Sequence, residues 1–124
     1  MEIDNLKAAP FAVETRAVSF SYQEGSLALD SVDFRVRPGE FVAMLASNGS
    51  GKTTLIKVLM GLLKQQADAV LIEGKSLHDI PARELYQKVG LVFQSPDDQL
   101  FAATVEEDVA FGPLHMGLPR AEVE

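Results

Sequence analysis

The 124-residue chain contains no cysteine and no tryptophan. Without cysteine it can form no disulfide framework, no zinc ribbon and no thiol nucleophile. It also lacks long apolar runs, because the longest, residues 41–46, is far shorter than the roughly 18 residues that a membrane span needs. The N-terminus is acidic and does not have the basic-then-apolar layout of a signal peptide. The sequence therefore predicts a soluble, cytoplasmic chain.

Positive charge is scarce, with 11 Lys and Arg against 18 Asp and Glu and a net charge of −7. Residues 97–124 hold seven of the acidic side chains and one basic side chain. An acidic chain without a basic cluster repels a phosphate backbone, so we expect no nucleic-acid partner. We expect the acidic end to form a solvated helical surface, with a docking face as the alternative.

An antiparallel hairpin is predicted after a loose leader at residues 1–12. Apolar and polar side chains alternate over residues 18–22, as in a half-buried strand. A second strand follows over residues 29–36, and its step from Leu29 to Val32 breaks the alternation and indicates a bulge. Glycine-containing turns follow the two strands at residues 23–26 and 37–40.

Residues 41–46 are continuously apolar, and residues 89–94 are apolar up to a polar final residue, Gln94, so neither segment has a polar face. Such segments are typical of strands buried on both sides of an α/β sheet. Between them we expect a helix over residues 55–63, apolar on most of its circumference and therefore nearly all buried. A short strand over residues 70–74 and a short helix over residues 81–88 complete this part.

Helix signals dominate the C-terminal end of the chain. Thr104 and Glu107 have the spacing of a capping box, which opens a helix over residues 105–111. The Gly-Pro pair at residues 112–113 is expected to stop that helix. Residues 118–122 are expected to start another helix.

A glycine-rich turn joins the first apolar segment to the following helix, with the sequence Ser47-Asn48-Gly49-Ser50-Gly51-Lys52-Thr53-Thr54. Strand, glycine-rich turn, Lys-Thr and helix are the context that a phosphate-binding loop requires. Gly49 and Gly51 allow backbone dihedrals that a Cβ would block, so successive N–H groups can point at phosphate oxygens. Lys52 can reach the β and γ phosphates, and the Thr53 hydroxyl is placed to ligate Mg²⁺.

One position departs from the phosphate-loop pattern, because Ala46 stands where the first glycine is usual. Alanine is tolerated there if its φ is negative, and it weakens the loop if its φ is positive. The alternative interpretation is a glycine turn that only precedes a core helix. The apolar segment and the helix that flank the turn favour nucleotide binding over this alternative.

These motifs together resemble the ATP-binding subunit of ABC transporters, over roughly residues 14–120. The stretch from residue 92 to residue 112 is similar to the energy-coupling-factor and cobalt/nickel importer group. The resemblance implies an α/β fold: residues 13–124 form a P-loop NTPase core with an N-terminal antiparallel β-subdomain, truncated before the rest of the sheet and the helical subdomain. The motifs that carry it are Val18-Ser19-Phe20-Ser21-Tyr22, Pro38-Gly39-Glu40-Phe41, Asn48-Gly49-Ser50-Gly51-Lys52-Thr53-Thr54-Leu55 and Gln94.

The resemblance also implies roles for side chains outside the loop. Tyr22 would stack on adenine, with a core position on its strand as the alternative. Gln94 would be catalytic and would touch Mg²⁺ and the attacking water, with a polar residue that closes a buried strand as the alternative. Together with Tyr22, the residues implied to bind ATP are Asn48, Gly49, Ser50, Gly51, Lys52, Thr53 and Thr54.

The motifs assign no definite role to several other polar and aromatic side chains. Residues 97–99 either lie near the membrane subunit or form a solvated turn. His78 and His115 have no ligand-spaced partners and are assigned no role. The aromatic side chains expected in the core, not at a cofactor, are Phe93, Phe101 and Phe111.

The resemblance to ABC transporter subunits implies ATP and Mg²⁺ as cofactors. It also implies two partners: a transmembrane transporter subunit and a second ATP-binding subunit, with which the protein forms a homo- or heterodimer. The location would be the inner face of the cell membrane, and the cargo a metal ion or vitamin chosen by other subunits. The sequence contains no Leu-Ser-Gly-Gly-Gln signature loop, no strand that ends in Asp-Glu and no switch histidine. We therefore expect an N-terminal fragment that binds ATP without hydrolysing it.

Two other functions fit parts of the sequence. The chain could be a non-catalytic nucleotide-binding or transporter-docking module. It could also be another P-loop enzyme, such as a small-molecule kinase, although the Tyr22 hairpin and residues 94–112 argue against this.

Overall fold

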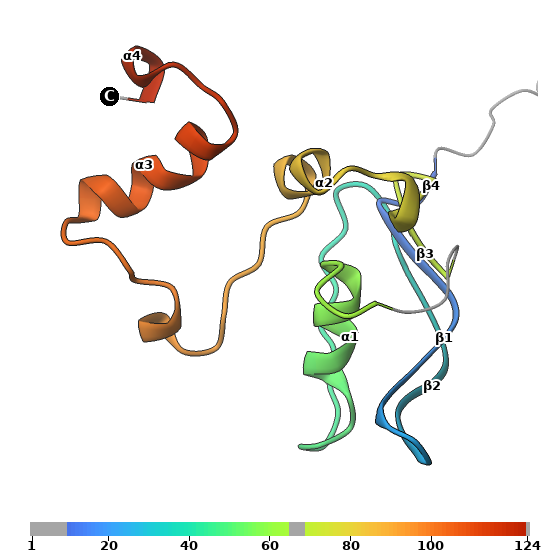
Figure 1. Cartoon of the computed structure of the whole chain (residues 1–124). Helices are drawn as coiled ribbons and strands as arrows, with labels where there is room; N and C mark the ends of the chain where they lie inside the picture. The colour runs from blue at the N-terminus through green and yellow to red at the C-terminus, as the bar shows by residue number, and fades with distance from the viewer. Residues whose placement is uncertain (1–9, 65–68, 124) are drawn as a thin grey trace, which may run out of the picture. The chain divides into compact units, whose positions relative to one another are not determined.

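The computed structural model describes residues 10–64 and 69–123 (Figure 1). The chain divides into two compact units, Met1–Pro81 and Ala82–Glu124. The elements of the first unit are β1 (Val13–Gln23), β2 (Ser26–Val36), α1 (Lys52–Leu59), β3 (Val70–Ile72), β4 (Lys75–Ser76) and η1 (Leu77–Asp79). Those of the second unit are α2 (Ala82–Lys88), η2 (Pro96–Asp98), α3 (Val105–His115) and α4 (Arg120–Val123).

The first unit is built on a four-stranded antiparallel sheet with the order β2-β1-β3-β4. Its β1–β2 hairpin confirms the predicted one, and Figure 1 shows the two strands running side by side. β1 begins at Val13, earlier than the alternation in the sequence predicts, because its first residues pair with β3 as well as with β2. Of the predicted leader, residues 1–9 lie outside the described residues, whereas the Ala12 N–H donates to the Val36 carbonyl at 2.8 Å.

The pairing of the hairpin shifts register at four places along β1, and the first two of these shifts are bulges, one on each strand. The pairing passes from Thr15–Phe34 to Val18–Val32, which leaves an extra residue on β1. It then passes to Phe20–Leu29, which leaves an extra residue on β2. The second bulge is the one that the step from Leu29 to Val32 predicts; the first was not predicted.

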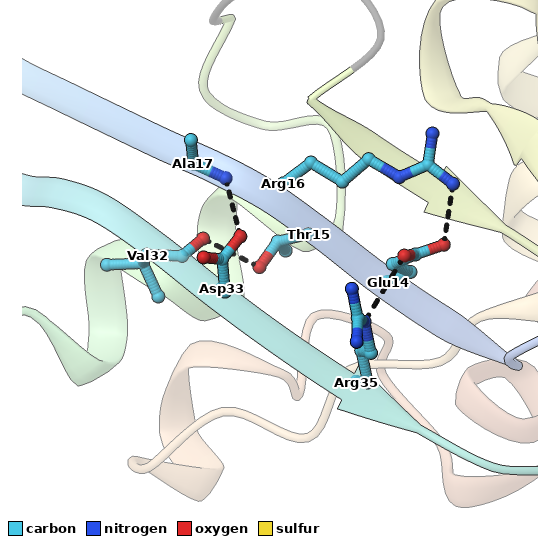
Figure 2. Close-up of polar contacts among 7 residues, drawn as sticks. All are labelled: Glu14, Thr15, Arg16, Ala17, Val32, Asp33 and Arg35. Carbon is cyan, nitrogen blue, oxygen red and sulfur yellow. Dashed lines mark hydrogen bonds and ion pairs between the residues drawn. The ribbon is translucent and has the colours of Figure 1, made fainter.

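Each bulge contains a non-glycine residue in the left-handed region, Ala17 and Ser31, both with φ of 48°. A bulge leaves an N–H without its ladder partner. Here a side chain on the opposite strand accepts each one at 2.8 Å: the Asp33 carboxylate from Ala17, and the Ser19 hydroxyl from Ser31. Figure 2 shows the first of these contacts.

Helix α1 packs against β2 and supplies Leu55, Val58 and Leu59 to the apolar core of the first unit. It is shorter than the predicted helix and ends at Leu59, where Met60 is its C-cap. The expectation that it is nearly all buried is wrong, because the side chains of Ile56 and Leu62 are 37% and 50% exposed. The buried apolar residues of this core include Val18, Leu29, Leu55, Val58, Leu59, Met60, Val70 and Ile72.

The two predicted core strands do not form. Residues 41–46 and 89–94 have no strand structure, and Phe41 and Leu45 are almost fully exposed. A strand exists only through hydrogen bonds to a neighbouring strand. The two segments fall in different units, and no strand in the described part of the chain pairs with either. Their apolar sequence is therefore insufficient to make them strands.

The second unit is helical, and the predicted capping box opens α3. The Thr104 hydroxyl accepts from the Glu107 N–H, and the Glu107 carboxylate accepts from the Thr104 N–H, both at 3.2 Å. The expected stop at residues 112–113 is wrong, because α3 continues to His115 with the proline inside it. Proline removes one helical hydrogen bond and crowds the carbonyl four residues earlier, which can kink a helix without ending it. Helix α3 ends before Gly117, whose φ of 88° suits a C-terminal glycine.

Aromatic side chains of the second unit are more exposed than the sequence predicts. The expectation that Phe93, Phe101 and Phe111 lie in a core is wrong, since 46%, 64% and 43% of their surfaces are exposed. Phe101 and Phe111 contact each other edge to face, with ring centroids 4.5 Å apart. Among the residues of 82–123 whose burial is described, only Leu85 is a buried apolar side chain, so little apolar surface is available to cover these rings.

Candidate nucleotide-binding site

The glycine-rich turn between residues 46 and 52 has the backbone that the sequence predicts. Gly49 and Gly51 have φ of 79° and 94°, a region that side-chain-bearing residues rarely adopt. Ala46 is not among the described non-glycine residues with positive φ. Its methyl group therefore introduces no left-handed strain, and the departure from the glycine pattern is tolerated by the backbone.

Gly51 also lies against the hairpin. A Cβ at this position would overlap the backbone carbonyl oxygen of Ala28 and lie 3.1 Å from Leu29 Cδ2. A Cβ on Gly49 would meet nothing within 4 Å. Gly49 is thus required for its dihedral alone, and Gly51 for both its dihedral and the close approach of the loop to β2.

The Lys52 ammonium folds back over the loop that precedes it. Its Nζ donates to the carbonyl oxygens of Ala46 and Ser47, both at 2.7 Å, and lies 3.4 Å from Ser50 Oγ. An ammonium has three donors. The loop itself therefore supplies partners for all three, and the positive charge is held next to the glycine backbone.

The N-terminus of α1 is free of acidic side chains and of a side-chain cap. Its first helical hydrogen bond runs from the Leu55 N–H to the Gly51 carbonyl at 2.9 Å. The N–H groups of residues 52–54 therefore have no acceptor within the helix, and the helix dipole adds positive potential there. Thr53 is exposed beside them, whereas Thr54 is buried.

Tyr22 lies close to this helix end. Its hydroxyl is 3.2 Å from Thr54 Oγ1, and its ring contacts Phe20 edge to face, with centroids 5.0 Å apart and planes at 85°. The side chain is 58% exposed, so it is not a core residue of its strand. An exposed aromatic ring beside a phosphate-type loop can present a surface to a base.

Gln94 belongs to the second compact unit, where it is exposed and lies outside any strand. Its catalytic and metal-binding role therefore stays a prediction. Nearby, Asp97 and Asp98 are exposed within η2, and Gln99 Nε2 donates to the Leu91 carbonyl at 3.5 Å. Within residues 10–64 and 69–123, no group of three or more His, Asp or Glu is arranged to hold a metal ion.

A magnesium site that depends on a nucleotide needs few protein ligands, because Mg²⁺ takes most of its oxygens from phosphates and water. The exposed Thr53 in the first turn of α1 fits that requirement. The N–H groups at the start of α1 that have no acceptor within the helix, the two left-handed glycines and the Lys52 ammonium fit a phosphate chain.

Several contacts of the site could not be predicted from the sequence. The carbonyl acceptors of Lys52, the Ala28 carbonyl beside Gly51 and the Tyr22–Thr54 pair all join residues whose types alone do not reveal the contact. Tyr22, at the end of the alternating strand, indicated a contact through its hydroxyl, but its residue type did not reveal that Thr54 is the partner.

Residues 29–123 match the family model described as ABC transporter, and the chain belongs to this family. It is 48% identical over 116 residues to the energy-coupling factor transporter ATP-binding protein EcfA of Methanocaldococcus jannaschii, covering 92% of this chain and 42% of that protein. It is 50% identical over 115 residues to the EcfA of Methanothermobacter thermautotrophicus, covering 90% and 37%. The chain thus spans about two fifths of the length of these curated relatives.

Among solved structures, the chain is similar to cbiO1 from Clostridium perfringens, described as part of the ABC transporter complex cbiONQ. The TM-score is 0.74 at 33% identity, over 92% of this chain and 46% of that one. This similarity confirms the predicted fold class, a P-loop NTPase with an N-terminal antiparallel sheet, of which this chain is a part. The structure contains no helix, within the residues described, that is long and apolar enough to cross a membrane.

Proposed function

We propose that this chain binds ATP together with Mg²⁺ at residues 46–54. The observation that carries the proposal is the N-terminus of α1, where N–H groups without an acceptor in the helix, two left-handed glycines and the Lys52 ammonium converge. This arrangement attracts a polyphosphate and needs no carboxylate of its own.

Each site residue has a role set by its position. Lys52 exchanges its carbonyl contacts for phosphate oxygens, a charge-assisted interaction worth about 1.5–3 kcal/mol. The backbone of residues 48–51 lines the phosphates, and Thr54 holds the first turn of α1 beside them. Thr53 offers its hydroxyl to Mg²⁺, which neutralises phosphate charge when bound. Tyr22 stacks on the adenine, a contact worth about 1–3 kcal/mol.

We further infer that the whole protein is the ATP-binding subunit of an importer that moves a metal ion or vitamin. The support is the likeness to EcfA proteins and to cbiO1 of the cbiONQ complex. Its partners would then be a transmembrane subunit and a second ATP-binding subunit, in a homo- or heterodimer, at the inner face of the cell membrane. Gln94 would contact Mg²⁺ and the attacking water in that assembly.

Hydrolysis by the 124 residues alone is not expected. Phosphoryl transfer depends on positioned charges around the γ-phosphate, and the sequence contains no signature loop and no Asp-Glu strand. The alternative function, a nucleotide-binding or transporter-docking module without catalysis, rests on the same site.

Calorimetric titration with Mg·ATP tests the binding site. We expect saturable binding by the chain, and a loss of about tenfold or more in affinity for Lys52→Ala. The matched control is Lys57→Ala, which removes the same charge from the last turn of the same helix. Equal affinities of the Lys52 and Lys57 variants would contradict the proposal, as would the absence of binding to a chain that unfolds cooperatively. Phosphate release, measured in parallel, tests the expected lack of hydrolysis.

A further inference from the structure

We propose that Tyr22 positions the phosphate-binding loop through its hydroxyl group, acting on Thr54, in addition to any stacking by its ring. The inference rests on the proposed ATP site and adds a positioning residue to it. It follows from the contact between the Tyr22 hydroxyl and Thr54 Oγ1, at 3.2 Å.

Thr54 is well placed to transmit such an effect. It is 7% exposed and lies in the first turn of α1, next to Lys52 and Thr53. Within the described residues, the Tyr22 hydroxyl is the partner that the structure gives to the Thr54 hydroxyl. A buried hydroxyl needs a hydrogen-bond partner, so removal of the Tyr22 hydroxyl leaves Thr54 unsatisfied.

The start of α1 lacks a side-chain cap, since Gly51 at its N-cap provides no side-chain hydrogen bond. The hairpin therefore holds this helix end at two points, where Gly51 approaches the Ala28 carbonyl and where Tyr22 meets Thr54. The Tyr22 ring packs edge to face against Phe20, and this contact restrains the position of its hydroxyl.

The two roles of Tyr22 have different chemical requirements. Stacking on a base needs the ring and no hydroxyl, and it affects only ligands that have a base. Positioning of the loop needs the hydroxyl, and it affects every ligand that uses the loop, because small misplacements of binding groups weaken all of their contacts. Tyr22→Phe separates the roles, since it keeps the ring and removes the hydroxyl.

The experiment measures the affinities of the chain for Mg·ATP and for magnesium tripolyphosphate, which has no base. The variants are Tyr22→Phe, Thr54→Val and their combination, with Tyr86→Phe as the matched control because Tyr86 is similarly exposed, on α2. We expect Tyr22→Phe to weaken both ligands by the same factor, about three- to tenfold. In the Thr54→Val background, Tyr22→Phe should not weaken binding further, because the Thr54 hydroxyl that the Tyr22 hydroxyl contacts is already absent.

Three results would overturn the inference: unchanged affinities in Tyr22→Phe, weaker binding of ATP alone, or an undiminished effect of Tyr22→Phe when Thr54 is valine. Affinity of the unsubstituted chain for the two ligands reports separately on the proposed ATP site. If that chain binds neither ligand, both proposals fail. Urea unfolding of each variant identifies any loss of affinity that arises from loss of the fold.

Discussion

The Asp33 carboxylate on β2 accepts a hydrogen bond from the backbone N–H of Ala17 on β1, at 2.8 Å (Figure 2). Ala17 is the left-handed residue of the first bulge, so its N–H has no ladder partner. A single side chain on the neighbouring strand thus stabilises a backbone conformation that alanine does not prefer.

We expect Asp33→Ala to lower the free energy of unfolding by about 1 kcal/mol, since it leaves this N–H without an acceptor in the protein. Asp33→Asn keeps an acceptor oxygen and should cost less. Urea unfolding followed by circular dichroism measures both. Equal stability of the alanine variant and the parent would show that water satisfies the bulge equally well.

Stability should depend on pH through Glu14. Its pKa is lowered, first by the hydrogen bond from Arg16 and then by the charges of Arg16 and Arg35, against the opposing effect of burial. Figure 2 shows both arginines converging on this carboxylate. A lowered pKa in the folded state contributes stability above the unfolded value of about 4.3, and this contribution is lost as the pH falls through the folded pKa.

The test compares urea midpoints between about pH 6 and pH 3 for the parent chain and Glu14→Gln. The parent should lose stability more steeply on acidification, because the glutamine variant has no carboxylate to protonate at this position. Parallel profiles would mean that the pairs Glu14–Arg16 and Glu14–Arg35 contribute nothing to folding.

The two loop glycines should differ in their tolerance of alanine. Both substitutions impose left-handed strain of about 1–2 kcal/mol, but only at Gly51 does the added Cβ meet backbone, the Ala28 carbonyl. Gly51→Ala should therefore destabilise the chain by a further amount of about 1–3 kcal/mol relative to Gly49→Ala. Gly90→Ala, with negative φ and open space around its Cβ, is the control in denaturant unfolding. Identical unfolding of the two loop variants would contradict the close approach to β2.

Helix α3 passes through Gly112 and Pro113, and this makes Gly112 intolerant of a side chain. The ring of a proline clashes with the Cβ of the residue before it when that residue has helical dihedrals. Gly112→Ala should therefore destabilise α3, although alanine has the higher helix propensity. Helical ellipticity during thermal unfolding measures the effect, and an increased signal would contradict the clash with Pro113.

Exposed apolar side chains at residues 41–46 should promote self-association. Phe41 and Leu45 are almost completely exposed, and contiguous exposed apolar surface is a known cause of association. Replacing both by serine should reduce concentration-dependent association in sedimentation velocity while leaving the urea midpoint unchanged, because neither side chain is buried. A fall in the midpoint would instead show that the segment is packed in solution.

Local sequence signals predicted the local parts of this fold well. The hairpin, the bulge between Leu29 and Val32, the loop glycines and the capping box of Thr104 each depend on residues close together in the chain. The backbone of these elements follows from dihedral preferences and short-range hydrogen bonds. Their prediction required no knowledge of distant contacts.

Features that depend on distant residues were predicted poorly. Apolarity marked residues 41–46 and 89–94 as strands, but a strand needs a partner that the described residues do not supply. The bulge at Ala17 depends on Asp33 from the other strand, and the Tyr22–Thr54 contact joins β1 to α1. In each case the residue type shows which kind of contact a side chain can make, but only the fold determines which residue is its partner.

The bulges at Ala17 and Ser31 offset each other, and so do the two register shifts nearer the turn, so that Val13 faces Val36 and Gln23 faces Ser26 just as in a regular ladder. Ala17 and Ser31 are the extra residues, and loss of either would restore regular pairing locally without moving the ends of the hairpin. At these two places β1 or β2 can therefore lose one residue while the strand ends keep their alignment.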